Sequence, residues 1–246
     1  MELSMTVNGL DVQAHYSDAE VDQILLPLLA SLTELWESKG SRILVMLAAP
    51  PAAGKTTLAA ALEYLSNTVP GSCKFQAIGM DGFHRHQSYL DEHYMDRDGQ
   101  SVLMARLKGA PETFDLDLLH AALESVADGE TCGWPTYDRT IHDPLDDAIT
   151  VDGDVVLIEG NYLLLDEEGW RDLAELADYT ISIVADPDFL YGRLVDRKSA
   201  SGIDRAEAEA FVRKSDLYNA RTVLDRSRDA DMTLELFTDG SYHKLA

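Results

Sequence analysis

The sequence predicts an α/β fold in which a mostly parallel central sheet is covered by helices on both faces. Two observations carry this prediction. Short apolar runs rich in Val, Ile and Leu alternate along the chain with longer segments whose apolar residues recur at helical spacing. One such run, residues 42–48, leads through a short loop ending in Gly54-Lys55-Thr56 into an Ala- and Leu-rich helical pattern. In sheets of this kind, ligands bind at the carboxyl ends of the strands.

The first forty residues predict a hairpin followed by a helix. Residues 4–16 form two short alternating runs on either side of Asn8-Gly9, which is a strong signal for a hairpin turn. Asp18 can cap a helix that runs to about Lys39, because the apolar residues after it recur at helical spacing. No residue of this segment indicates chemistry, so we interpret it as a packing extension.

The remaining elements continue the alternation. Further strands are predicted at 74–80, 155–159, 179–185 and 232–237. Helices are predicted near 55–66, 115–127, 168–176, 187–199 and 205–224. Residues 82–112 form the longest stretch without a clear period, and such stretches are often functional. We expect residues 1–246 to form a single domain, of which residues 1–40 are the hairpin and helix.

The composition is that of a globular protein with few cations. Of 246 residues, 46% are hydrophobic and 26% are charged, and the formal net charge is −24. So acidic a chain disfavours nucleic acid and anionic membranes as partners, and each cation near a candidate site becomes more informative. Cys73 and Cys132 are too few for a disulfide framework. We find no signal peptide and no apolar stretch long enough to span a membrane, so we expect a cytoplasmic protein.

The loop after residue 48 has the features of a Walker A phosphate-binding loop. Successive backbone N–H groups and the positive end of the following helix form a concave site for anions. The residues expected to hold the phosphates are Ala52, Ala53, Gly54, Lys55, Thr56 and Thr57. Lys55 would reach the β- and γ-phosphates of ATP, and the Thr56 hydroxyl would bind Mg²⁺.

This loop departs from the usual pattern at its start. Ala49 stands where the first glycine of Gly-x-x-x-x-Gly-Lys-Ser/Thr is usual, and Pro50 and Pro51 remove two N–H donors. Ala49 would be strained only if its position requires a positive φ, at a cost of about 1–2 kcal/mol. The alternative interpretation is an ordinary strand-to-helix turn that happens to contain Gly-Lys-Thr.

Two acidic residues follow predicted strands. Asp81 comes directly after strand 74–80, where it can accept a proton from a substrate hydroxyl or order Mg²⁺. Glu159 ends the apolar run 155–159, and it can hold Mg²⁺ through water or pair with Lys55. The alternatives are a simple Asp-Gly turn at Asp81 and, at Glu159, a strand pattern common in α/β proteins.

A cationic cluster precedes a loop of small residues near position 200. Arg193 and Arg197 are four residues apart, on one face of the predicted helix 187–199. In so acidic a chain, the cluster indicates a lid at 193–206 that closes over a transferring phosphate. The alternative is a solvated helix whose charges pair with Asp196 and Asp204.

Four further motifs occur in order after the phosphate loop. They are Asp81-Gly-Phe-His84, Lys108-Gly-Ala-Pro-Glu-Thr-Phe-Asp115, Pro135-Thr-Tyr-Asp-Arg139 and Glu159-Gly-Asn-Tyr-Leu-Leu-Leu165. Together they resemble the phosphoribulokinase/uridine kinase family, which includes bacterial pantothenate kinase. The likeness covers nearly the whole chain and is greatest to an uncharacterised bacterial branch described as nucleoside/nucleotide kinase-like or fructose-transport-associated kinase.

The resemblance implies a three-layer α/β/α P-loop NTPase fold and an ATP-dependent kinase that uses Mg²⁺. Asp81 then matches the catalytic base of the family. Lys55 and Thr56 keep their phosphate and metal roles, and Glu159 matches the acid beside the metal. The segment 193–205 matches the arginine-bearing lid, so its arginines join the expected catalytic groups.

The resemblance also places the acceptor pocket at Tyr137, Arg139 and His142, with His84 close to Asp81. Uridine kinases have an aromatic residue where this chain has Arg139, and an arginine suits a carboxylate or several hydroxyls better than a base. We therefore expect a polar acceptor, such as a sugar or a pantothenate-like alcohol, to compete with nucleosides. The alternative for Tyr137 and His142 is a polar surface connection.

Two other classes of function stay open. A P-loop GTPase or metallochaperone is disfavoured because the chain contains no Asn-Lys-x-Asp motif. A nucleotide-binding regulatory protein, or an NTPase without small-molecule kinase activity, agrees with the altered loop but not with the retained Lys55, Asp81 and Glu159. The expected partner is a small molecule with a hydroxyl group, and the sequence leaves a homodimer open.

Overall fold

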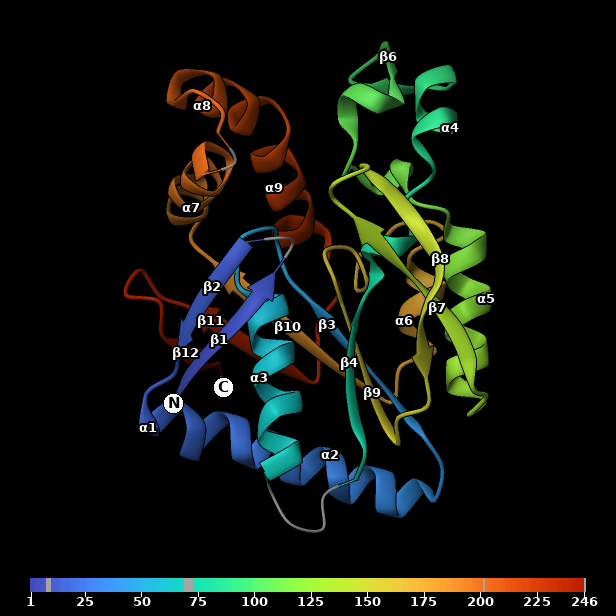
Figure 1. The fold of residues 1–246 in the computed structure, drawn as a ribbon, viewed down its shortest axis with the longest axis vertical. Coiled ribbons are helices and arrows are strands. Elements are labelled where there is room, and N and C mark those ends of the chain that lie inside the picture. Colours follow the sequence, from blue (N-terminus) through green and yellow to red (C-terminus); the bar gives the residue numbers. More distant parts are fainter. Residues whose placement is uncertain (8–9, 69–72, 201, 246) are drawn as a thin grey trace.

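The computed structural model describes residues 1–7, 10–68, 73–200 and 202–245 (Figure 1). Its centre is a sheet with the strand order β12-β11-β10-β3-β9-β4. These strands are β3 Ile43–Ala48, β4 Phe75–Gly79, β9 Val155–Gly160, β10 Tyr179–Ala185, β11 Met232–Leu236 and β12 Tyr242–Lys244. Neighbours from β4 to β11 are parallel, and β12 pairs antiparallel with β11 at one edge. The predicted mostly parallel sheet is confirmed.

Helices cover both faces of the sheet because the side chains of β3 alternate between two apolar cores. The odd-numbered residues of β3 join the core that includes α2 (Leu26–Lys39) and α3 (Lys55–Thr68). Its even-numbered residues join the core that includes α5 (Leu116–Ala127) and α6 (Arg171–Ala174). Every residue of β3 is buried, which explains why this strand is a continuous apolar run.

The N-terminal hairpin lies beside the C-terminal strand. β1 (Glu2–Val7) and β2 (Leu10–His15) pair antiparallel, as predicted, whereas the expected Asn8-Gly9 turn lies outside the described residues. Residues of β2 and of β12 line a common hollow, and both chain ends lie in this part of the molecule (Figure 1). The extension therefore packs on the domain, but it also reaches the edge where ligands are expected.

The helix after the hairpin begins one residue earlier than predicted. Its N-cap is Ser17 and not Asp18, because the side chains of Ser17 and Glu20 form a reciprocal capping box. The chain passes from α1 (Asp18–Glu20) through a π-helical segment, Val21–Leu25, into α2. The helix ends at a glycine in the left-handed conformation, directly after the predicted Lys39.

Several elements were not predicted. The segment 82–112 contains α4 (Gln87–Glu92) and the strand pair β5 (Tyr94–Arg97) and β6 (Gln100–Leu103). A longer hairpin of β7 (Cys132–Asp138) and β8 (Asp143–Val151) also stands outside the main sheet. Most of β8 is exposed, so its residues carry no apolar alternation that would reveal a strand.

The prediction of one helix over 205–224 is wrong. The segment forms α8 (Arg205–Lys214) and α9 (Asp216–Arg226), separated at Ser215, whose φ and ψ are −123° and −67°. Apolar residues keep their helical spacing across Ser215, so the hydrophobic periodicity alone does not reveal the break between α8 and α9. Together with α7 (Pro187–Ala200), these helices stand above the carboxyl end of the sheet (Figure 1).

Candidate active site

Three neighbouring strands of the sheet end at the candidate site. β3 leads into the phosphate loop, β9 carries Glu159 near its end, and Asp81 is the second residue after β4. The strand that carries Glu159 lies between the other two, with Glu159 in register with Leu47 of β3 and Gly79 of β4. The sheet therefore brings together the loop and both acids that the sequence indicated.

The phosphate loop holds two residues in the left-handed region. Ala52 has a φ of 67° and Gly54 a φ of 86°. Ala49 is not among the described residues with a positive φ, so the strain that the sequence allowed for falls at Ala52 instead. That conformation costs an alanine about 1–2 kcal/mol. Ala52 packs on the apolar cluster between α7 and α8, and this contact offsets part of the cost.

The C-terminal strand β12 holds the phosphate loop in place. The Tyr242 hydroxyl donates a hydrogen bond to the carbonyl of Ala53 at 2.8 Å. A Cβ atom at Gly54 would lie 2.3 Å from the same hydroxyl, so only glycine fits there. The Thr57 hydroxyl donates to the Gly54 carbonyl at 2.7 Å and supports the first turn of α3. Sequence reasoning missed Tyr242, because nothing local to it indicates contact with a loop almost 190 residues earlier.

Lys55, Thr56 and Glu159 form the floor of the site. The Thr56 hydroxyl donates to Oε1 of Glu159 at 2.8 Å, and Nζ of Lys55 lies 3.8 Å from Oε2. The side chains of Lys55 and Glu159 are only 14% and 13% exposed. Burial raises the pKa of Glu159, and the Lys55 charge offsets part of that rise.

This floor fits a magnesium ion that arrives with a nucleotide. The Thr56 hydroxyl and the Glu159 carboxylate are adjacent hard oxygen donors, the kind that Mg²⁺ takes together with phosphate oxygens and water. Among the described residues, no group of three or more His, Cys, Asp or Glu side chains could hold a metal. These donors therefore agree with an ion that the protein and the nucleotide hold together, and not with an ion held by protein ligands alone.

Asp81 is held as a carboxylate in a short 3₁₀ turn, Met80–Phe83. Burial by itself favours its protonated form, but neighbouring groups outweigh this effect and lower the pKa of Asp81. Those groups are His84, Lys55, Arg139 and Arg197. The Arg139 guanidinium lies 3.5 Å from Oδ2 of Asp81, and the Asp81 side chain is still 42% exposed, so an acceptor can reach it.

The Asp-Gly pair is not a simple turn. Gly82 is not among the glycines with a positive φ in the described part of the chain. A Cβ atom at Gly82 would lie 2.1 Å from the carbonyl oxygen of Pro135. Gly82 therefore allows β7 to approach the Asp81 turn closely, and Trp134 of β7 also donates to the Gly79 carbonyl at 2.8 Å.

His84 packs inside the site and fixes the turn. Its Nδ1 donates to the backbone carbonyl of Asp81 at 2.8 Å, and its ring lies 3.9 Å from that of Phe114 and 5.2 Å from that of Tyr137. Burial lowers the pKa of His84, and the nearby Asp81 opposes this only in part.

The expected acceptor residues are only partly brought together. Tyr137 and Arg139 lie near Asp81 at the end of β7, with the guanidinium of Arg139 5.8 Å from the Tyr137 ring. His142 has an exposed side chain, and its carbonyl accepts a hydrogen bond from Nζ of Lys108 at 2.6 Å. Lys108 also lies 5.1 Å from the Tyr137 ring, so it belongs to this group of side chains although sequence reasoning gave it no role.

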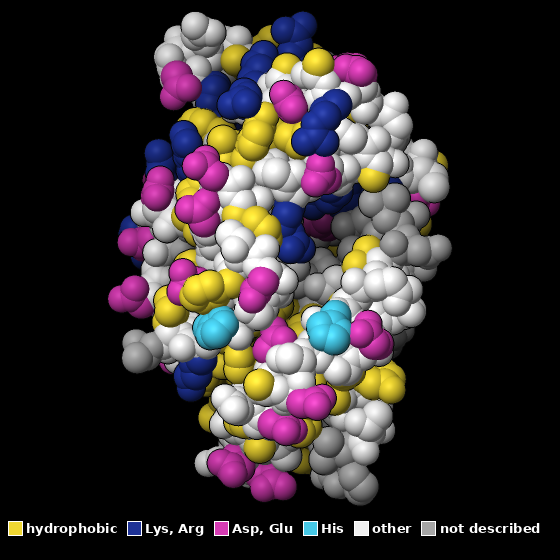
Figure 2. Space-filling model, turned by 90° about the vertical axis from the view of Figure 1, so that its left-hand side faces the viewer, with side chains coloured by type: hydrophobic (Ala, Val, Ile, Leu, Met, Phe, Trp, Pro, Cys, Tyr) yellow, Lys and Arg dark blue, Asp and Glu magenta, His cyan; other side chains and the backbone are white. Residues whose placement is uncertain are grey.

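The two arginines expected in the lid both lie on α7 and have different neighbours. Arg193 lines a hollow together with Thr57. The Arg197 charge contributes to the low pKa of Asp81 and offsets the rise that burial causes at Asp216. Lys and Arg side chains gather in the upper part of this face, over α7 and α8, whereas acidic groups dominate its lower part (Figure 2).

The acids that could have neutralised these arginines have other partners. Asp196 accepts a hydrogen bond from Arg205 at 3.0 Å, and Asp204 caps α8 by accepting from the Ala206 amide. The described contacts therefore do not support a solvated helix whose lid arginines pair with Asp196 and Asp204. In the described part of the chain, no helix is long and apolar enough to cross a membrane.

Comparison of the chain with known proteins shows the family to which it is similar. The model of the phosphoribulokinase/uridine kinase family matches residues 44–233. The chain is 42% identical to "Uncharacterized protein YggC" of Escherichia coli over 99% of both chains. It is 31% identical to "Putative uridine kinase C227.14" of Schizosaccharomyces pombe, over 87% of this chain and 94% of the relative.

A solved structure supports the same assignment. The crystal structure described as a "putative fructose transport system kinase" from Silicibacter sp. TM1040 superposes with a TM-score of 0.71 at 31% identity, over 83% of this chain and 98% of that chain. The matched segment 44–233 includes the phosphate loop, Asp81, Glu159 and both lid arginines. With its P-loop fold and these motifs, the chain belongs to the phosphoribulokinase/uridine kinase family.

Proposed function

We propose that this protein transfers the γ-phosphate of ATP to a hydroxyl group of a small polar molecule. The observation that carries the proposal is the arrangement at three adjacent strand ends. Lys55, Thr56 and Glu159 form a site for phosphate and metal, and the ionised Asp81 stands beside it at the end of β4. A phosphate site next to an accessible carboxylate is what phosphoryl transfer to an alcohol requires.

The residues have separate tasks in the proposed reaction. The Asp81 carboxylate accepts the proton of the acceptor hydroxyl as that oxygen bonds to the γ-phosphorus and the bond to the β-bridging oxygen breaks, releasing ADP. Lys55 and Arg197 balance the negative charge that moves onto the leaving phosphates. Bound to Thr56 and Glu159, Mg²⁺ would supply further positive charge at the β- and γ-phosphates.

The acceptor end of the site favours a polar molecule without an aromatic base. Arg139 and Lys108 flank Tyr137, so the pocket beside Asp81 presents two cations and one phenol ring. A guanidinium offers several donors in a fixed fork that suits hydroxyls or a carboxylate. Sugars and pantothenate-like alcohols agree with this lining, and nucleosides remain the competing class.

A screen for phosphorylated products tests the proposal. The protein is incubated with ATP and Mg²⁺ and a panel of nucleosides, pantothenate, ketoses and pentoses, and the products are identified by mass spectrometry. We expect at least one acceptor to gain a phosphate, and Lys55→Met to lower its turnover by about 10²-fold or more. A protein that binds ATP but phosphorylates no member of the panel would instead be a nucleotide-binding regulator, and near-native turnover in Lys55→Met would contradict the loop assignment.

A further inference from the structure

Lys108 is the first residue of the motif 108–115, and its ammonium group joins three other segments of the chain. Its Nζ donates to Oε1 of Gln87 at 2.8 Å and to the carbonyl of His142 at 2.6 Å, and it lies 5.1 Å from the centroid of the Tyr137 ring. Gln87 begins α4, whereas the other two residues belong to the β7–β8 hairpin. Lys108 therefore links α4 to the hairpin that carries the expected acceptor residues.

The tip of this hairpin, residues 139–142, carries Arg139 at one end and a strained residue at the other. The Arg139 guanidinium lies 3.5 Å from Oδ2 of Asp81. His142 has a φ of 56°, in the left-handed region that residues with a Cβ atom enter only at an energetic cost. Such strain persists where surrounding contacts hold the backbone. The carbonyl that Lys108 binds belongs to this strained residue, so the lysine stabilises the conformation in which Arg139 faces Asp81.

A second set of contacts fixes the same tip to α4. The Gln87 amide donates to Oδ1 of Asp143 at 2.8 Å, and Nδ1 of His86 lies 3.3 Å from Oδ2. Burial opposes the ionisation of this carboxyl, but the amide of Gln87 and the charges of His86 and Lys108 outweigh burial and lower the pKa of the carboxyl. Because Gln87 binds Asp143 with its backbone and Lys108 with its side chain, α4 and the lysine support the tip together.

Lys108 is itself held by contacts of the residue that follows it. The carbonyl of Gly109 accepts hydrogen bonds from the Tyr162 hydroxyl at 2.6 Å and from Nδ2 of Asn219 at 3.2 Å. Both of these donors belong to buried residues, one after β9 and the other in α9. The lysine therefore connects the hairpin tip to the core of the domain.

We propose that Lys108 is a positioning residue, which holds the tip of the β7–β8 hairpin so that Arg139 faces Asp81 and the acceptor. The proposal rests on the proposed kinase function, and it gives a task to a motif residue that had none. Lys108 acts through Arg139 in this assignment and contacts neither ATP nor the reacting atoms. The acceptor should therefore bind more weakly once Lys108 is replaced, although Arg139 is still present.

Three variants at and near this position test the proposal. Lys108→Met keeps an unbranched side chain but removes the charge and the N–H donors, whereas Lys108→Arg keeps both. Arg106→Met is the matched control, because Arg106 is exposed and its side chain makes no hydrogen bond or ion pair in the described part of the chain. Each change is made alone and together with Arg139→Ala. The probe is the nucleoside, pantothenate, ketose or pentose that the unmodified protein phosphorylates fastest, and KM is measured for this acceptor and for ATP.

We expect Lys108→Met to raise the KM for the acceptor about fivefold or more, and no further than Arg139→Ala does, while the KM for ATP stays within about twofold. In the Arg139→Ala background the same change should alter the KM for the acceptor by less than about twofold, because the residue through which Lys108 acts is gone. Lys108→Arg should recover most of the lost effect, and Arg106→Met should match the unmodified protein. Additive effects of Lys108→Met and Arg139→Ala would overturn the proposal, since Lys108 would then contact the acceptor by itself.

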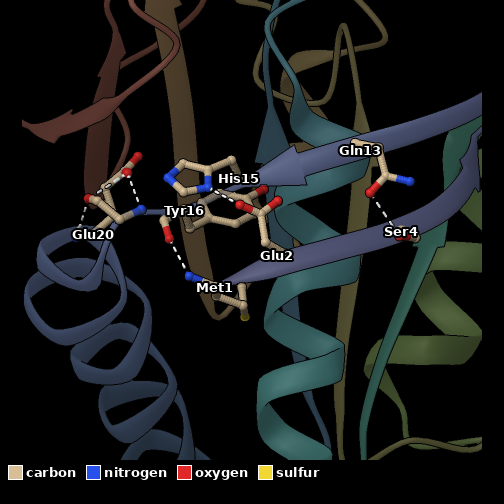
Figure 3. A network of polar contacts seen from close by, with 8 residues as sticks. Met1, Glu2, Ser4, Gln13, His15, Tyr16 and Glu20 are labelled. Atoms are coloured by element: carbon tan, nitrogen blue, oxygen red, sulfur yellow. Dashed lines mark hydrogen bonds and ion pairs between the residues drawn. The ribbon is translucent and has the colours of Figure 1, made fainter.

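Hydrogen exchange measures the hold on the tip without any acceptor. The backbone amides of residues 139–142 should exchange about tenfold faster in Lys108→Met than in the unmodified protein. Gln87→Met, which removes one partner of the lysine, repeats both measurements if Lys108→Met does not fold. Its matched control is Gln13→Met, because Gln13 accepts a hydrogen bond from Ser4 across the other hairpin, β1–β2 (Figure 3). Unchanged exchange at the tip would overturn the proposal.

Failure of the kinase proposal would look different. If the unmodified protein phosphorylates no member of the panel, the proposed function fails and the kinetic role of Lys108 fails with it, even where exchange at the tip is faster in Lys108→Met. If the unmodified protein phosphorylates an acceptor and Lys108→Met matches it in KM and in exchange, only the positioning role is overturned.

Discussion

Asp81 and Glu159 are carboxylates at neighbouring strand ends, yet their surroundings shift them in opposite directions. Burial dominates at Glu159 and raises its pKa, whereas at Asp81 the surrounding positive charges outweigh burial and lower its pKa. The sequence alone shows an acid after each of two strands and does not distinguish their pKa shifts. A group with a lowered pKa is ionised throughout the neutral range, and this suits Asp81 for the task of a base.

Replacement of Asp81 tests that task. Asp81→Asn should lower kcat by about 10²–10⁴-fold while affinity for ATP is largely retained, because the amide cannot accept a proton. Since the pKa of Asp81 is lowered from that of an ordinary aspartate, its stabilising charge and its activity are lost only as the pH falls through that lowered value. The ratio of mutant to unmodified rate should therefore be the same at pH 6 and pH 8. A variant whose melting temperature changes more than its rate would show that Asp81 only shapes the turn.

Arg139 is the residue on which the choice of acceptor depends. It lies 3.5 Å from Asp81 and is 45% exposed, so its guanidinium can turn towards a bound acceptor. Arg139→Ala should raise the KM for the acceptor tenfold or more, as expected for loss of one charge-assisted contact of about 1.5–3 kcal/mol. Arg171→Ala is the control, because Arg171 pairs with Asp166 near α6. Best activity on uridine or cytidine, with unchanged kinetics in Arg139→Ala, would contradict this reading of the pocket.

At the scale of elements, α7 connects the two halves of the proposed site. Arg193 and Arg197 stand one helical turn apart; Arg193 lines the hollow that residues of β2 and β12 share, whereas the charge of Arg197 lowers the pKa of Asp81. α7 also packs on Ala52 through the cluster that it shares with α8. A movement of this helix would therefore affect the phosphate loop through Ala52 and the surroundings of Asp81 through Arg197.

The two arginines should give different kinetic effects. Arg197→Ala should reduce turnover more than it weakens binding of the acceptor, since a closing lid contributes mainly in the transition state. Arg193→Ala should also lower turnover, and we expect it in addition to raise the KM for ATP. Arg205→Ala is the control, because Arg205 is already paired with Asp196 and Glu209 on the lid surface.

Proteolysis reports closure of the lid directly. Trypsin can cleave after Lys198 and Arg205, and cleavage between residues 198 and 206 should slow when an ATP analogue and an acceptor are both bound. Protection that does not change with either ligand would favour a solvated helix without a closing motion.

At the scale of the whole molecule, the net charge of −24 opposes folding through self-repulsion. Raising the salt concentration from about 10 mM to about 150 mM shortens the range of this repulsion from about 30 Å to about 8 Å. The melting temperature at pH 7 should therefore rise, by about 2–4 °C for each kcal/mol gained. Lys55→Met should show the same slope if the effect belongs to the whole surface, and a melting temperature that falls with salt would contradict the prediction.

From the sequence alone, the central parallel sheet could be predicted correctly, and the chemical core of the site could be proposed. β3 could be recognised because a strand buried on both faces must be a continuous apolar run, and the loop because Gly54, Lys55 and Thr56 follow it directly. Asp81 and Glu159 could be placed at one edge of the sheet because parallel strands end together. These inferences need only local patterns and the geometry of a parallel sheet.

Features that depend on contacts between distant segments became visible only in the three-dimensional structure. Neighbours far away in the chain contribute to the opposite pKa shifts of Asp81 and Glu159, and Tyr242 donates a hydrogen bond to a loop almost 190 residues earlier. The structure also shows that the strain lies at Ala52 instead of Ala49. A hollow lined by residues of β2 and of β12 likewise combines two segments from opposite ends of the chain. A periodic pattern reports which face of an element is buried, but it does not report which other element covers that face, and the site is completed by that choice.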